Sequence, residues 1–456
     1  MASPNPENGC LNKLKALPQN IWNKVVEKAN KAKKMAKDDP RKIIHSLKVG
    51  LALTLVSLFF YFKPTYDGFG VSAMWAVLTV IVVFEYSAGA TMGRGLNRML
   101  ATLIGSSLGF GAHWIATHSG KTGEPILIGI FVFIFAGIVT FVRFFPEMKA
   151  RYDYGLLILV LTFCLISVSG YRDDEVIHMA HKRVTTIVIG SIISVVICIL
   201  ICPVWIGEDL HNSIAGNLEK LGNFLEGFGS EYFGTSEGGQ ANNTNKSFLQ
   251  GYKSVLASKS SEETMANLAR WEPCHGRFRF RHPWKQYLKV GTLARECAYK
   301  VDALNCYLHA ETQTPMEMRR KIKEMCARIS SETGKALKEL ASTVKTMTKS
   351  SKEDTHIANS KEAVEDLKCM LKTGLWEDAL VLEIIPAAAV ASLLIDIITR
   401  TEKIAESVQE LALLAHFKSP NTTSTSRQQH LLHRGTIQPT SDRSNHIIVI
   451  DMPASE

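Results

Sequence analysis

Long apolar segments between residues 46 and 206 are the feature that most limits what this chain folds into. A helix needs roughly 20 apolar residues to cross a bilayer, with a usable range of about 17 to 25. Strand-like alternation is absent and the connections are short, which favours antiparallel helical hairpins over a barrel. The six candidate spans are 46–62, 71–86, 97–115, 125–142, 152–169 and 183–206. The predicted fold class is an all-α membrane protein with six transmembrane helices and a C-terminal helical cytosolic domain.

Composition divides the 456 residues into four parts. Residues 1–45 are a basic cytosolic segment, and its stretch LPQNIWNKVVEKANKAKKMAKDDP predicts a cationic amphipathic helix. Such a helix either lies at an anionic inner leaflet or forms a solvated arm. The transmembrane domain is 46–206 and the helical cytosolic domain is 207–417, followed by a Ser/Thr-rich tail, 418–456, that is predicted to be disordered.

The polar half of the chain shows helical spacing of leucine and alanine in six segments. These predicted helices are 208–232, 244–270, 284–311, 315–349, 358–373 and 376–415, with a loop at 236–246. The run IIPAAAVASLLIDII, 384–398, resembles a seventh span, but Glu383, Pro386 and Asp396 leave too short an apolar stretch. It is predicted to be a buried helix of the soluble domain.

Basic residues gather on alternate connections, and this asymmetry predicts the orientation. The N-terminal segment is rich in lysine, whereas the connections after the first and third spans carry one lysine each, Lys63 and Lys121. The loop after the fifth span is mixed, with Asp173, Asp174 and Glu175. The connections after the second and fourth spans carry Arg94 and Arg98, and Arg143, Lys149 and Arg151. Both termini are therefore predicted to be cytosolic.

Sequence motifs for catalysis or for energy coupling are absent. The chain has no phosphate-binding GxxxxGK[ST] loop and no HExxH, and nothing assembles a nucleophile, a base and an orienting acid. His178 and His181 lack further metal ligands at fixed spacing, and the nine cysteines show no paired spacing. We therefore expect no enzyme activity, no metal and no cofactor, which favours a passive conduit.

Cationic residues near or inside the predicted spans are the candidate functional residues. A charge in a membrane helix commonly costs about 3 kcal/mol, so such a residue usually faces a cavity or a partner. Arg98 opens the third predicted span, and Arg183 opens the sixth with Lys182 beside it. The planar guanidinium suits carboxylates and other oxyanions. Arg94 is either a topological anchor or a pore residue, and Glu85 either neutralises one arginine or marks the membrane boundary.

Four strings carry a resemblance to a known family. They are WAVLTVIVVFEYSAGATMGRGLNR (75–98), FVRFFPEMKARYDYG (141–155), CPVWIGEDLH (202–211) and WEPCHGRFRFRHPWKQY (271–287). Together they closely resemble plant aluminium-activated malate transporters, a family of anion channels, and the resemblance runs from about residue 40 to about 417. Within the family, the chain is similar to the guard-cell, rapidly activating branch, which implies a role in stomatal movement.

The resemblance implies a homodimer with six membrane helices per subunit and a pore along the subunit interface. It also implies that Arg94, Arg98 and Arg183 coordinate anions, while the glycines of 84–98 permit tight helix ends. The expected partners are malate, chloride, nitrate, sulfate, the lipid bilayer and a kinase acting on the tail, with no nucleic acid. The expected location is the plasma membrane in preference to the vacuolar membrane.

Three functions remain open from the sequence. The first is a passive, voltage-responsive anion channel. The second is a proton-coupled organic-anion transporter, which needs titratable groups in mid-membrane, where only His113 is found, near the end of a span. The third is a membrane scaffold whose helical domain binds partners, which leaves the arginines unexplained. The channel is the preferred prediction.

Overall fold

The computed structural model describes residues 7–58, 74–169, 176–233, 249–279, 281–309, 316–350, 352–372 and 381–419. Fourteen helices occur in these ranges, with two isolated β-bridges and no strand. The predicted all-α membrane protein is therefore confirmed. The acidic loop with Asp173, Asp174 and Glu175, the loop at 236–246 and the tail beyond residue 419 lie outside the described residues, as does the side chain of His178.

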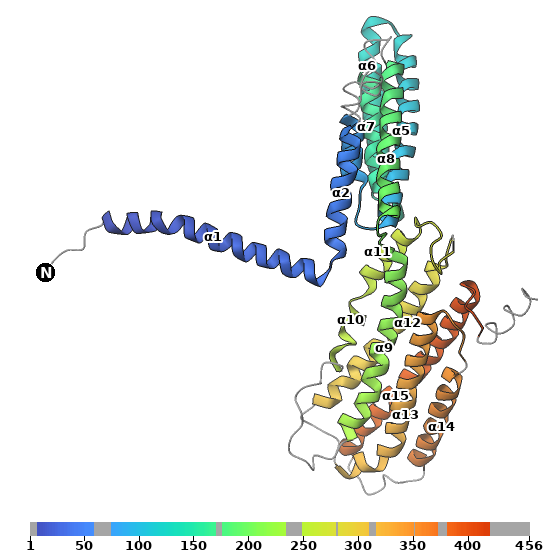
Figure 1. Ribbon diagram of the computed structural model, residues 1–456. Coiled ribbons are helices and arrows are strands. Elements are labelled where there is room, and N and C mark those ends of the chain that lie inside the picture. The colour runs from blue at the N-terminus through green and yellow to red at the C-terminus, as the bar shows by residue number, and fades with distance from the viewer. Residues whose placement is uncertain are drawn as a thin grey trace, which may run out of the picture.

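The apolar half forms one group of helices, here called the membrane bundle. Its helices are α2 (Arg41–Leu58), α4 (Met74–Val83), α5 (Ala88–Thr117), α6 (Gly120–Val142), α7 (Pro146–Ser169) and α8 (Val176–Leu200). Helix α5 packs against α6, α7 and α8, while α2 and α4 pack together on α8. Figure 1 shows these helices running side by side in one direction. Each predicted span corresponds to one of them.

The number of membrane-spanning helices is a separate question. Five described helices are long and apolar enough to cross a bilayer, namely α5, α6, α7, α8 and α15 (Val381–Leu414). Helix α4 is apolar but has only 10 residues in the described part. The count of six spans therefore stays a prediction. Helix α15 packs elsewhere, because its buried Val390, Leu394 and Ile397 belong to the core of the polar half.

The start of α5 differs from the prediction. The third span was predicted from residue 97, and Arg94 and Arg98 were counted with the connection after the second span, yet the helix begins at Ala88. Ser87 caps it, since its Oγ accepts a hydrogen bond from the backbone N of Ala90 at 3.2 Å. The prediction that both arginines lie in a connection is wrong, because the glycine-rich stretch is already helical and is held by packing.

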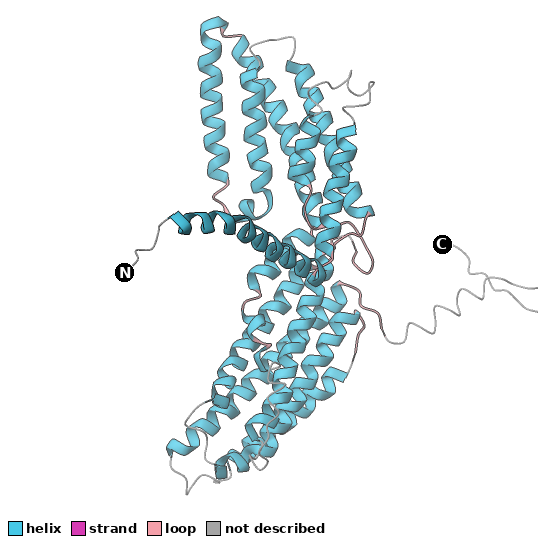
Figure 2. Ribbon diagram, turned by 60° about the vertical axis from the view of Figure 1, so that its left-hand side comes forward, coloured by secondary structure: helices cyan, strands magenta, loops and turns pink. Residues whose placement is uncertain are grey.

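The polar half forms the C-terminal bundle, stacked end to end with the membrane bundle (Figure 2). The prediction of one helix over 244–270 is wrong in the described part, because a turn at Ala257 and Ser258 separates two helices. The packed pairs include α9 with α13 and α12 with α15. The helices are α9 (Ile206–Phe233), α10 (Lys253–Leu256), α11 (Lys259–Ala269), α12 (Trp284–His309), α13 (Met316–Thr346), α14 (Lys352–Lys372) and α15.

Glycines of α5 allow the two bundles to meet. A Cβ atom at position 93 would lie 2.9 Å from Cδ1 of Trp271, and one at position 89 would lie 2.9 Å from Cγ of Glu272. Only glycine permits this approach between α5 and the segment that follows α11. The glycines therefore serve close packing inside a helix, whereas the sequence predicted that they serve helix ends.

Helix α1 (Glu7–Asp38) leaves both bundles. It confirms the predicted N-terminal helix and extends it toward the N-terminus. Figure 1 shows α1 running across the direction of α2, at the level where the two bundles meet.

Candidate anion site

Arg98 lies well inside α5, about 15 Å along the axis from Ala88 at 1.5 Å per residue. The residue is only 5% exposed. Its Nη1 donates a hydrogen bond to the phenol oxygen of Tyr154, on α7, at 2.8 Å. Its Nε finds no acceptor among the described residues. Arg98 is thus a buried cation with a neutral partner.

Arg183 lies on α8 and is 4% exposed. Its guanidinium carbon sits 3.9 Å from the ring centroid of Trp75, on α4, in a cation–π contact. Its Nε also has no acceptor in the described part of the chain. A ring face stabilises the cation without cancelling its charge, so Arg183 keeps hydrogen-bonding capacity for another group.

Arg98 and Arg183 are close enough for their positive charges to repel each other. Neither forms an ion pair with any carboxylate that the structure describes. Two like charges buried together without a counter-charge are unfavourable in a medium of low dielectric constant. A dianion between them would relieve the repulsion, and its oxygens would accept hydrogen bonds from the Nε–H groups, which have no acceptor among the described residues. The structure brings together the two residues that the sequence placed at the ends of different spans.

Arg94 is in a different environment. Its side chain is 46% exposed and forms an ion pair from Nη1 to Oε1 of Glu85. Nη1 also lies 3.4 Å from the carbonyl oxygen of Val82, and the guanidinium is 5.9 Å from the ring of Tyr154. Glu85 therefore neutralises Arg94, one of the two roles open to it from the sequence. Lys182 is half-buried beside Arg183 and forms no ion pair with a described carboxylate.

Buried hydroxyls continue from the arginines into the membrane bundle. Five have no hydrogen-bond partner among the described residues: Thr102 and Ser106 on α5, Thr162 and Ser167 on α7, and Ser191 on α8. On α5 they follow Arg98 at intervals of four, so they share its helix face. Hydroxyls can donate to an anion without trapping it. These hydroxyls were not predicted from the sequence, although the four-residue spacing 98, 102, 106 was a usable signal.

The junction between the bundles is held by a buried carboxylate. Glu272 accepts hydrogen bonds from the backbone N of Ile206 at 2.6 Å and of Gly207 at 3.1 Å, which satisfies the first turn of α9. Burial raises the pKa of Glu272 to about 7. Beside it, the rings of His275 and Trp205 stack with centroids 3.8 Å apart. The junction thus brings the WEPCH segment (271–275) into contact with the residues at the end of CPVW and at the start of α9.

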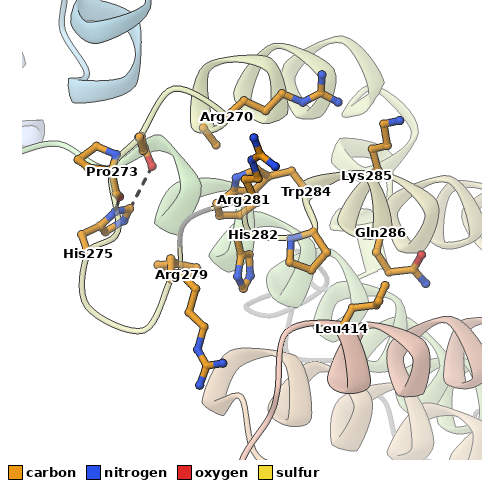
Figure 3. Close-up of a pocket in the computed structure, with 14 residues that line it drawn as sticks. Arg270, Pro273, His275, Arg279, Arg281, His282, Trp284, Lys285, Gln286 and Leu414 are labelled. Atoms are coloured by element: carbon orange, nitrogen blue, oxygen red, sulfur yellow. Dashed lines mark hydrogen bonds and ion pairs between the residues drawn. The ribbon is translucent and has the colours of Figure 1, made fainter.

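A cavity of about 500 Å³ opens in the C-terminal bundle near this junction. Its lining includes Arg270, Arg279, Arg281, Lys285 and Trp284. In Figure 3 the side chain of Arg279 points away from Arg270 and Arg281. Its cationic groups do not converge on one point, so the cavity offers a weaker anion site than the pair in the membrane bundle.

Comparison with known proteins places the chain among transporters. The family model described as "Aluminium activated malate transporter" matches residues 33–378. Aluminum-activated malate transporter 2 of Arabidopsis thaliana is 51% identical over 431 residues, covering 94% of this chain and 85% of that relative. Aluminum-activated malate transporter 1 of Triticum aestivum is 45% identical over 405 residues, covering 87% of each.

Proposed function

Because the chain belongs to the aluminium-activated malate transporter family, we propose that it is a passive channel for malate and for chloride, nitrate and sulfate. The relatives are named as malate transporters, which supports transport of malate or other anions across a membrane. A conduit of this kind needs no catalytic group, so the proposal includes no enzyme activity.

The observation that carries the proposal is the pairing of Arg98 with Arg183. The two guanidiniums come from different helices, are almost fully buried and have no described counter-charge. Charges in such a place are expensive unless they act on a permeating ion. Fixed cations in a pore select anions by sign, and malate matches the planar donors of arginine with its two carboxylates.

Passage also requires that the anion leaves. Tyr154 and Trp75 hold the two guanidiniums by neutral contacts, and each competes only weakly with an anion. The hydroxyls of Thr102 and Ser106, which have no partner in the described part of the chain, then offer a next, weaker set of donors along α5. A graded series of sites allows fast conduction, because no single site binds too tightly.

Arg94 and Lys182 have a secondary role in this proposal. Arg94 is compensated by Glu85, so it contributes mainly as an anchor and as part of the positive potential around the site. Lys182 adds potential beside Arg183. Direct coordination is assigned to Arg98 and Arg183.

Further parts of the proposal rest on the family resemblance and on charge asymmetry. They are cytosolic termini, six spans, a homodimer with the pore at its interface, voltage-responsive gating, a plasma-membrane location, a role in guard cells and phosphorylation of the tail. A cysteine label placed near Lys121 should react from outside the cell, and one near Lys149 only from inside. The reverse pattern would contradict the orientation.

The decisive experiment is anion current from purified protein in proteoliposomes. With a malate gradient and no pH gradient, the current should reverse at the Nernst potential of malate. A reversal potential that follows an imposed pH gradient would identify the proton-coupled transporter instead. Absence of current from correctly inserted protein at all voltages would favour the scaffold.

A further inference from the structure

The N-terminal helix meets the membrane bundle at a sharp elbow, between α1 and α2. Figure 1 shows the two helices at a steep angle, with α1 running away from the other helices of the membrane bundle, so the inner corner of the elbow opens on the outer side of α2. A cavity of about 320 Å³ lies in this corner, and its lining is Lys28, Lys31, Ala32, Met35 and Ala36 from α1 with Lys42, Ile43 and Ser46 from α2. Arg98 and Arg183 are not part of this lining.

The elbow is fixed by hydrogen bonds around Asp39. Its carboxylate accepts from the backbone N of Arg41 at 3.2 Å and from the phenol of Tyr86 at 3.4 Å. Arg41 in turn forms an ion pair with Asp209 of α9 at 3.3 Å. The start of α2 is thereby tied to both bundles, so the cavity has a defined place at the foot of the membrane bundle.

The chemistry of the cavity is amphipathic. Lys28 and Lys31 are exposed and form no ion pair with a described carboxylate. Lys42 pairs with Asp39, with 3.7 Å between Nζ and Oδ2. Below these ammonium groups, Met35 and Ile43 give an apolar floor and are 49% and 44% exposed. Ile43, Leu47 and Leu51 continue along α2 at intervals of four, all exposed. A path for a hydrocarbon chain therefore begins at a cluster of cations.

We propose that the elbow of α1 and α2 binds the headgroup of an anionic phospholipid in the leaflet next to the C-terminal bundle. The phosphate lies among Lys28, Lys31 and Lys42, and an acyl chain follows the exposed leucines of α2. A bilayer offers both an anionic headgroup and an acyl chain at the end of the membrane bundle. Lysine-rich amphipathic segments bind anionic membranes through electrostatic attraction together with burial of apolar surface. The apolar residues Trp22 and Val25 of α1, also exposed, extend the contact across the membrane surface.

The test uses the full-length protein in nanodiscs, with the photoreactive residue p-benzoylphenylalanine in place of Met35. One set of nanodiscs contains only phosphatidylcholine and the other contains phosphatidylserine as well. After illumination, mass spectrometry identifies the crosslinked species. The expected result is an adduct with phosphatidylserine in clear excess over its share of the lipid.

The triple variant Lys28→Gln, Lys31→Gln, Lys42→Gln should lower that excess by about tenfold or more, because each lysine near an anionic surface contributes about fivefold. The matched control is Lys253→Gln, Lys323→Gln, Lys372→Gln, three exposed lysines of the C-terminal bundle that form no ion pair with the described carboxylates. This control should leave the excess unchanged. Size-exclusion profiles of both variants check that the protein is folded.

Four outcomes would overturn the proposal. The first is an adduct whose yield only follows the lipid composition, and the second is an excess that survives the lysine substitutions. The third is a crosslink to a second copy of the chain. The fourth is loss of the lipid adduct when soluble glycerophosphate is added to the nanodiscs. The last result would identify a site for free phosphate compounds, and the third a protein interface.

Discussion

Arg98 of α5 donates a hydrogen bond to the phenol oxygen of Tyr154 on α7, and this bond is the only one that the described residues provide for its guanidinium. The partner is neutral, so the bond orients the cation without compensating it. Helices α5 and α7 pack along their length, and Asn97 adds a hydrogen bond from Nδ2 to the carbonyl oxygen of Arg151 at 2.9 Å. The position of the guanidinium is therefore set by helix packing.

The substitution Tyr154→Phe tests this relationship. It removes one oxygen and leaves Arg98 with an additional free donor, so malate should bind more tightly and leave more slowly. We expect the half-saturating malate concentration to fall by about threefold and the maximal current to fall with it, since conduction needs weak binding. Current–concentration curves in proteoliposomes measure both. A higher half-saturating concentration would show that Tyr154 itself contacts the anion.

The two buried arginines can be separated from Arg94 by selectivity. In Arg98→Ala or Arg183→Ala, malate current should fall more than chloride current, because a dianion interacts about twice as strongly with a fixed cation at equal distance. A tenfold drop in the malate-to-chloride permeability ratio corresponds to about 1.4 kcal/mol. Arg94→Lys keeps the charge beside Glu85 and should change the ratio little. Reversal potentials at matched surface expression provide the ratios.

Two further results complete that experiment. Arg98→Lys should keep anion over cation selectivity but weaken the preference for oxyanions, since an ammonium lacks the planar pair of donors. An unchanged permeability ratio in both alanine variants would contradict the site, and anion transport would then rest on the family membership alone.

Periodicity and charge predicted most of the fold. Helices α6, α7, α9, α12 and α13 begin or end close to their predicted bounds because their apolar patterns are regular. The start of α5 was missed because SAGATMGRG has low helix propensity, and what makes it helical is tertiary. Ala88 donates to the carbonyl oxygen of Val204 at 3.1 Å, and Gly93 packs on Trp271. Such contacts leave no local signal.

In the candidate site too, residues with a local sequence signal were predictable and residues that depend on tertiary contacts were not. Arg98 and Arg183 were predictable, because a charge inside an apolar helix is expensive and therefore conspicuous. Tyr154 and Trp75 were not, since they come from α7 and α4, far from their arginines in sequence. The pairing of Arg94 with Glu85 was one of two options in the sequence, and only the geometry selects it.

Gly93 and Gly111 form a matched pair on α5. In Gly93→Ala the new Cβ meets the ring of Trp271 at 2.9 Å, and such overpacking should cost about 1–3 kcal/mol. In Gly111→Ala the new Cβ has no described atom within 4 Å outside its own helix turn, and helix propensity should stabilise the protein by about 0.5–1 kcal/mol. The apparent melting temperatures should shift in opposite directions. Equal shifts would show that Gly93 does not hold the two bundles together.

Glu262 and Arg295 form a buried ion pair inside the C-terminal bundle, with side chains 1% and 9% exposed. Asn217 donates to the other carboxylate oxygen at 3.0 Å. Glu262→Ala strands the cation of Arg295 and should cost about 3–5 kcal/mol, which lowers the melting temperature by about 10 °C. The exposed neighbour Glu263→Ala is the control and should change stability by less than about 0.5 kcal/mol. Similar losses in both variants would contradict the importance of the pair.

The stability of the junction should depend on pH through Glu272, because burial raises the pKa of this carboxyl from 4.5 to about 7. The folded state holds this proton more tightly than the unfolded state, so the contribution of Glu272 is present below pH 4.5 and is lost as pH rises to about 7. The shift corresponds to about 3 kcal/mol.

Buried His211 and His282, whose pKa values are lowered to about 4 by burial, change stability in the opposite sense. The comparison must therefore be with Glu272→Gln, which leaves both histidines in place and removes only the titrating carboxyl. As pH rises from 4.5 to about 7, the melting temperature of Glu272→Gln should increase relative to that of the unsubstituted protein. Above pH 7 the difference between the two melting temperatures should stay constant. Parallel curves over the whole range would show that Glu272 stays ionised at the junction, with its charge fully stabilised by the first turn of α9.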